Sequence, residues 1–151
     1  MKKISLFALF CILAAGVKAQ GTTQYNKALA DSLGADEYGM KMYVLVILKT
    51  GTNVSATKAE TDSLFAGHMA NMGKLVKENK LIVAGPLGKN DQTYRGIFIL
   101  NTKSIDEAKA ILATDPAYKA QLLDAEIMNW YGSAALAEYL KADGKIGKYK
   151  F

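Results

Sequence analysis

The sequence predicts an α+β fold in which helices cover one face of an antiparallel sheet. Short apolar runs rich in β-branched and aromatic residues, such as MKMYVLVILK at 40–49 and LIVAGP at 81–86, read as strands. Between them lie longer segments whose apolar residues recur at three- and four-residue spacings, as in amphipathic helices. Capping signals mark where these segments begin. Together these observations indicate one α+β domain.

The first 19 residues have the pattern of a secretory signal peptide. Two lysines precede an apolar run at 4–15, and VKA at 17–19 fits a small-residue cleavage site. The run is too short for a membrane span, which needs about 20 residues. Cys11 follows Phe10, where lipidation sites carry a small residue, so we expect cleavage without a lipid anchor. The protein is therefore expected to be exported, to the periplasm or the medium, with no stable membrane anchor.

Cleavage changes the composition of the chain. It removes the single cysteine, which excludes disulfides, and three lysines, which lowers the formal net charge from +5 to +2. Residues 20–151 suit one domain with a buried core. The basic tail, 143–151, is interpreted as a solvated end. No basic stripe with interleaved aromatic residues indicates a nucleic-acid partner.

Residues 20–39 show little periodicity and are expected to form a linker or N-terminal arm before a domain at 40–142. The first strand, 40–49, is apolar on both faces at its centre. Thr57 and Glu60 form a capping box that opens a helix, and Asn79 suits its left-handed end. The expected buried stripe of this helix comprises Leu64, Phe65, His68, Met69, Met72, Leu75 and Val76.

The remaining elements follow in order. LIVAGP and RGIFILN are strands, and Ser104 with Glu107 forms a second capping box before a helix with one apolar face. Asp115 before Pro116 is a cap followed by proline at a first helical position, so a short helix is expected. AEIMNWY is the fourth strand, and SAALAEYLKAD is a last helix capped by Ser133.

The order strand, helix, strand, strand, helix, strand, helix resembles a ferredoxin-like split βαβ fold, with its main helices on one face of the sheet. The first and third strands are apolar on both sides. The second face must therefore also be shielded from water, most simply by the same sheet of another subunit. We expect a homodimer joined sheet to sheet, unless the N-terminal arm or the last helix covers this face.

Several kinds of chemistry lack their residues. With one histidine and no cysteine after cleavage, a chain cannot build a His/Cys metal cluster. GPLGKN lacks the phosphate-loop spacing, and neither a G-x-S-x-G elbow nor a dinucleotide G-x-G-x-x-G motif is present. A carboxylate-rich metal site stays open but has no spacing signal. We therefore expect neither a metal nor a cofactor.

His68 is the single polar residue of its predicted stripe. It is either a core histidine with backbone or water partners, or the working group of a pocket. Imidazole exchanges a proton near neutrality, since its reference pKa is about 6.5. Likewise, Asp115 is a good helix cap whatever else it does, and a carboxylate has two oxygens to share. Trp130 and Tyr131 favour core or interface packing.

A series of motifs resembles the YCII-related (YciI-like) family: GHMANMGKLVKENKLIVAGPL, YRGIFIL, SIDEAKAILATDPAYKA and a strand ending in NWY, across residues 40–131. The resemblance implies a dimeric α/β barrel of the ferredoxin-like superfamily. It also implies an active site made of a histidine and an aspartate, which match His68 and Asp115. Phe65 stands where many relatives have an arginine, so an anionic substrate is not implied.

The leading hypothesis is a cofactor-independent small-molecule enzyme of lyase or isomerase type. His68 would abstract a proton beside a carbonyl or leaving group, and Asp115 would orient it. Two alternatives remain open: a non-catalytic module that binds a small molecule in the same pocket, and a cofactor-free monooxygenase-like enzyme.

Overall fold

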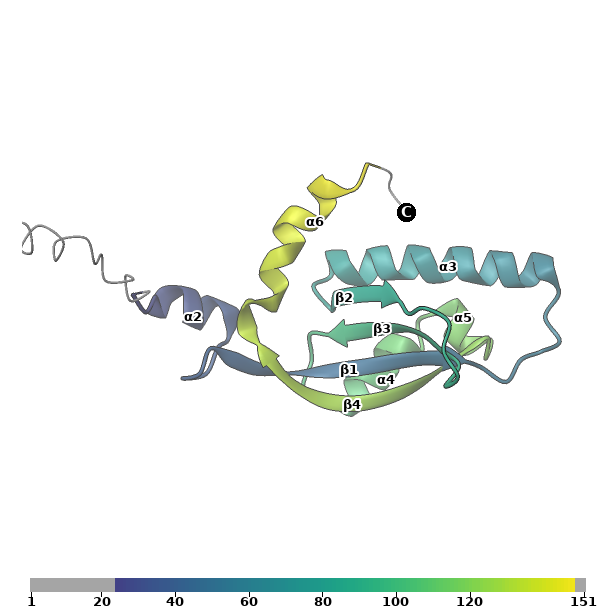
Figure 1. Ribbon diagram of the computed structural model, residues 1–151, viewed down its shortest axis with the longest axis horizontal. Helices are drawn as coiled ribbons and strands as arrows, with labels where there is room; N and C mark the ends of the chain where they lie inside the picture. The colour runs from purple at the N-terminus through teal and green to yellow at the C-terminus, as the bar shows by residue number, and fades with distance from the viewer. Residues whose placement is uncertain (1–23, 149–151) are drawn as a thin grey trace, which may run out of the picture.

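The computed structural model describes residues 24–148, which form one four-stranded sheet with helices packed against it (Figure 1). The predicted signal peptide lies outside the described residues, as do residues 149–151 of the basic tail. The elements are α2 (Lys27–Leu33), β1 (Met40–Thr50), α3 (Lys58–Lys77), β2 (Leu81–Pro86), β3 (Tyr94–Leu100), α4 (Ile105–Leu112), α5 (Pro116–Lys119), β4 (Leu123–Ser133), the 3₁₀ helix η2 (Ala134–Tyr139) and α6 (Leu140–Ile146).

The strand order in the sheet is β2-β3-β1-β4, and every neighbouring pair is antiparallel. This mixed α+β architecture is consistent with the predicted ferredoxin-like fold. The central strand β1 pairs with β4 along its whole length, from Met40 opposite Ser133 to Thr50 opposite Leu123. All four predicted strands are present, and β4 extends two residues beyond its prediction at each end.

Helix α3 begins as predicted, with both halves of the capping box formed. The Glu60 carboxylate accepts from the Thr57 backbone N–H at 2.8 Å, and the Thr57 side chain accepts from the Glu60 N–H at 3.3 Å. Asn79 has a φ of 56°, the left-handed conformation expected at the end of this helix. The predicted stripe was too wide, because Met69 and Val76 are exposed. Each follows a sheet-facing residue by one position, which is 100° around the helix.

The second capping box forms only in part. The Ser104 hydroxyl accepts from the Glu107 N–H at 3.2 Å, as predicted. The Glu107 carboxylate does not return the bond to Ser104, because it accepts instead from the Thr102 hydroxyl at 2.5 Å. The Thr102 oxygen in turn accepts from the Ser104 N–H at 3.0 Å. A third side chain therefore mediates the reciprocal contact.

The main hydrophobic core lies between one face of the sheet and helices α3, α4 and α5. Its buried members alternate along the strands and recur at helical spacing on α4, as the sequence predicts. They are Val44, Val46, Leu48, Leu75, Leu81, Phe98, Leu100, Ala108, Ile111, Leu112, Ala117 and Leu123.

A second, smaller core lies on the opposite face of the sheet. Tyr43, Ile82 and Ile99 are buried there beneath side chains of η2 and α6. The Tyr139 hydroxyl donates to the carbonyl of Ile82 at 2.5 Å and ties η2 to β2. The C-terminal segment therefore covers part of the face for which the sequence suggested a partner subunit. Leu45, further along β1, is only half-buried.

The last helix starts as a 3₁₀ helix, which the sequence did not predict. Ser133 caps it as expected, accepting from the Ala135 N–H at 3.3 Å. A 3₁₀ helix has three residues per turn, so positions i and i+3 lie in line. Ala134, Ala137 and Leu140 repeat at this interval, and all three are buried or half-buried. Ala137 and Leu140 pack against the second core, together with Leu136.

The expected N-terminal arm contains the short helix α2. Asn26 caps it by accepting from the Leu29 N–H at 3.0 Å, and Gly34 ends it with a φ of 69°. Beyond the helix, the Asp36 carboxylate accepts a hydrogen bond from the Tyr131 hydroxyl of β4. In Figure 1, α2 lies beyond the end of the sheet at which β1 begins.

Candidate functional site

His68 lies in the second half of α3 and is 8% exposed. Its ring stacks on Phe98 of β3, with centroids 5.9 Å apart and planes at 16°. Phe65, one turn earlier on α3, meets the ring edge-on at 6.0 Å. The imidazole is therefore held between two aromatic side chains on the helix-covered face of the sheet.

Asp115 lies between α4 and α5 and is 2% exposed. As the Asp-Pro pattern predicts, it caps α5: its Oδ1 accepts from the backbone N–H of Ala117 at 2.9 Å and of Tyr118 at 3.4 Å. Pro116 occupies the first turn, where its fixed φ suits the helix. One carboxylate oxygen thus orients the side chain and leaves the other available.

The second oxygen contacts the histidine. His68 Nδ1 lies 2.5 Å from Asp115 Oδ2, although the residues are 47 positions apart in the sequence. The structure thus brings together the two residues matched through the family resemblance. An ionised carboxylate only accepts hydrogen bonds, so the proton belongs on Nδ1 and the lone pair of the neutral ring on Nε2.

The other ring nitrogen, Nε2, is not bonded within the described part of the chain. Every hydrogen bond of His68 involves Nδ1. No fully buried side-chain nitrogen or oxygen of residues 24–148 lacks a partner. It follows that Nε2 is not fully buried, so water can reach it through the small exposed part of this side chain. The pair therefore presents one basic nitrogen to solvent while the other is fixed.

A neighbouring polar contact was missed by the sequence reasoning. The side chains of Asn71 and Thr114 are hydrogen-bonded, with Asn71 Nδ2 at 3.1 Å and Oδ1 at 3.2 Å from Thr114 Oγ1. Asn71 lies nearly one turn after His68, and Thr114 directly precedes Asp115. Their positions beside the predicted pair were the signal that could have indicated this contact. It adds a second polar link between α3 and the start of α5.

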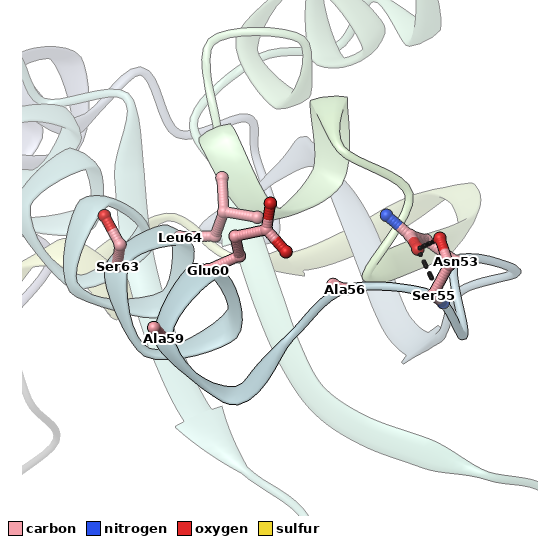
Figure 2. A pocket seen from close by; sticks show the side chains of 7 residues that line it. All are labelled: Asn53, Ser55, Ala56, Ala59, Glu60, Ser63 and Leu64. Carbon is pink, nitrogen blue, oxygen red and sulfur yellow. Dashed lines mark hydrogen bonds between the residues drawn. The ribbon is translucent and has the colours of Figure 1, made fainter.

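Surface hollows elsewhere do not include the pair. Figure 2 shows a hollow between the loop that carries Asn53 and Ser55 and the first turns of α3, with Leu64 on its wall. Its volume is about 650 Å³, and a second hollow, of about 390 Å³, is lined partly by Tyr118. Neither has His68 on its wall. These two hollows therefore do not supply the pocket expected around His68. The His68 side chain itself is only narrowly open to solvent.

Two further findings concern residues 24–148. No group of three or more His, Cys, Asp or Glu side chains there is arranged to hold a metal ion. Within the same residues, no helix combines the length and apolar character needed to cross a membrane.

Comparisons with known proteins identify the family. Comparison with curated proteins finds no match. Among solved structures, the 5-chloro-2-hydroxyhydroquinone dehydrochlorinase TftG from Burkholderia phenoliruptrix AC1100, in complex with 2,5-dihydroxybenzoquinone, is 24% identical, with a TM-score of 0.42 over 58% of this chain and 92% of that one. A structural similarity this low gives no information about the reaction of this chain. The family model of the YCII-related domain matches residues 42–131, more than half of the sequence, including both His68 and Asp115. The chain therefore belongs to the YCII-related family.

Proposed function

We propose that this protein is an exported, cofactor-independent enzyme of lyase or isomerase type that acts on a small molecule. His68 serves as the general base, and Asp115 orients it. The observation that carries the proposal is the 2.5 Å contact between His68 Nδ1 and Asp115 Oδ2, which leaves Nε2 without a partner in the described residues. A fixed tautomer with an accessible basic nitrogen is what general base catalysis requires.

In the proposed reaction, Nε2 takes a proton from a carbon next to a carbonyl group. The electron pair of the broken C–H bond passes into the enolate. In a lyase reaction this pair forms a double bond and expels a leaving group from the neighbouring carbon. In an isomerase reaction the proton returns to a different carbon. The Asp115 carboxylate stabilises the imidazolium that exists in between. Phe65 and Phe98 offer apolar surface beside the ring.

The test does not require knowledge of the natural substrate. Small ketones, lactones and hydroxylated aromatic compounds are incubated with the protein in D₂O, and NMR follows the replacement of carbon-bound hydrogen by deuterium. We expect exchange of at least one compound class with the wild-type chain. Loss of a general base typically lowers such a rate by about 10²- to 10⁴-fold, so His68→Gln should abolish the exchange.

The matched control is Met69→Gln, a neighbouring change at an exposed position of the same helix. It should leave the exchange rate unchanged. Exchange that persists in His68→Gln would contradict the proposal, because another group would then be the base.

A non-catalytic binding module is the second candidate. The two aromatic side chains around His68 and its narrow opening to solvent favour it. Native mass spectrometry of protein purified from its host decides between the two. A bound molecule that is recovered unchanged after prolonged incubation, and lost in His68→Leu, would indicate binding without turnover.

A further inference from the structure

Helix α3 contains two glycines with different surroundings. A Cβ built on Gly73 would meet nothing within 4 Å, whereas one built on Gly67 would lie 2.9 Å from Cγ and 3.4 Å from Cβ of Pro116. A contact under 3.0 Å is essentially never seen for a real Cβ. Because glycine is a poor helix former, its presence at position 67 weakens α3. What it permits is the close approach of the Pro116 ring.

This approach occurs directly beside the His68–Asp115 pair. Gly67 precedes His68 in α3, and Pro116 follows Asp115 at the start of α5. The contact between Gly67 and Pro116 therefore lies directly beside the 2.5 Å contact between His68 and Asp115. The separation of α3 and α5 at Gly67 sets how closely the imidazole and the carboxylate can meet.

We propose that Gly67 is a positioning residue for the His68–Asp115 pair, acting through its contact with Pro116. An effect of Gly67 on catalysis rests on the proposed function, whereas its effect on the distance between His68 and Asp115 does not. Pro116 has little freedom to yield, because its ring fixes φ and its neighbour Asp115 is held by two hydrogen bonds to the backbone of α5. A methyl group at position 67 must therefore move α3, and with it His68, away from Asp115.

The experiment uses ring ¹⁵N NMR of the tag-free chain. His68 is the single histidine, so its ring signals need no assignment. The wild type should show a protonated Nδ1 and an unprotonated Nε2 at a pH where the ring is neutral. In Gly67→Ala the two ¹⁵N shifts should move toward each other, since a weakened bond to Asp115 lets the ring sample both tautomers. Gly73→Ala, the matched control, should keep the wild-type shifts.

A double variant tests the route of the effect. Pro116→Ala removes the Cγ that lies closest to the added methyl group. Gly67→Ala/Pro116→Ala should therefore recover the wild-type tautomer, which a general loss of helix stability would not predict. If Gly67→Ala does not fold, the double variant decides alone: a folded protein with wild-type ring shifts supports the proposal, and any other result overturns it.

Unchanged ring shifts in folded Gly67→Ala, or an equal change in Gly73→Ala, would overturn the proposal. The deuterium exchange described above should fall by about 10- to 100-fold in Gly67→Ala if the displacement approaches 1 Å. The two proposals can fail separately. The ring shifts need no substrate, whereas exchange that survives His68→Gln contradicts the enzyme and leaves the positioning of the pair untouched.

Discussion

Asp115 combines two roles in one carboxylate. Oδ1 caps α5, and Oδ2 holds the imidazole of His68. A buried polar atom that loses its partner destabilises a protein by about 1–3 kcal/mol, so each oxygen of this side chain needs its bond. Asp115 can therefore cap the helix and hold the histidine at the same time.

Two substitutions of Asp115 should separate these roles. Asn keeps a cap oxygen, so the free energy of unfolding of Asp115→Asn should lie within about 1 kcal/mol of the wild-type value. Its amide nitrogen would face Nδ1 and can only donate, which forces the proton onto Nε2 and removes the base. Asp115→Ala loses the cap, at about 0.5–2 kcal/mol, and also leaves Nδ1 without its partner. Urea unfolding measures the stabilities, and ring ¹⁵N shifts measure the tautomer. Equal destabilisation by both variants would argue against this division.

At the scale of elements, one hydrogen bond joins the segment after α2 to β4. The Asp36 carboxylate accepts from the Tyr131 hydroxyl and also from the backbone N–H of Tyr38 and Met40, at 2.9 and 3.0 Å. The Tyr131 hydrogen bond, followed by that of Met40, lowers the pKa of Asp36 below its usual 3.8. The bond to Asp36 raises the pKa of Tyr131 above its usual 10.0. Each shift favours the hydrogen-bonded protonation state.

The sign of these shifts predicts a pH window. The lowered pKa of Asp36 contributes stability above 3.8 that is lost as the pH falls through the folded value. The raised pKa of Tyr131 contributes stability below 10.0 that is lost as the pH rises through its folded value. Thermal unfolding of wild type and Tyr131→Phe should therefore differ most between these limits and converge outside them. A melting-temperature difference that does not vary with pH would contradict the predicted pH window.

At the scale of the whole molecule, the second face of the sheet is only partly covered. The segment η2–α6 packs over Tyr43, Ile82 and Ile99. On the same face, Leu45 and Ile47 of β1 are half-buried, and Met128, paired with Leu45, is 40% exposed. The uncovered part of this face therefore still presents the apolar surface from which the sequence predicts a dimer. We still propose a homodimer there, because a partner sheet would remove this apolar surface from water.

Met128→Lys tests the homodimer. In a monomer this exposed side chain should tolerate the change, whereas in a dimer the charge would lie in the interface and weaken association. Sedimentation velocity at micromolar concentration should show a dimer for wild type and a shift toward monomer for Met128→Lys. Met69→Lys is the control, since Met69 is equally exposed, at 40%, but lies on α3. A wild-type monomer would contradict the prediction.

Export is predicted from residues 1–19, which lie outside the described structure. Mass spectrometry of the protein from its native host should show a chain that begins at Gln20, without the leader. An intact Met1, or a lipid on Cys11, would contradict the proposal. The proposed domain at 40–142 would then remain, since it does not depend on the leader.

The sequence by itself determined the features that depend on near neighbours. Alternating apolar residues set the strands, Thr57 with Glu60 set the start of α3, Asn79 set its end, and Asp115 with Pro116 set α5. These signals act within a few residues, so backbone preferences and local hydrogen bonds decide them. The pairing of His68 with Asp115 was predicted from the family resemblance, because no local pattern relates positions 47 residues apart.

Only the tertiary structure decided which surfaces meet. Met69 and Met72 look alike in the sequence, yet only the position of the sheet leaves Met69 exposed. Asn71 met Thr114 because the packing of α3 brought side chains 43 positions apart within reach. The winding of η2 as a 3₁₀ helix over the second core likewise depends on the sheet beneath it. The physical reason is common to all of these: burial and hydrogen-bond partners are properties of the packed chain, and local preference yields where packing offers a better contact.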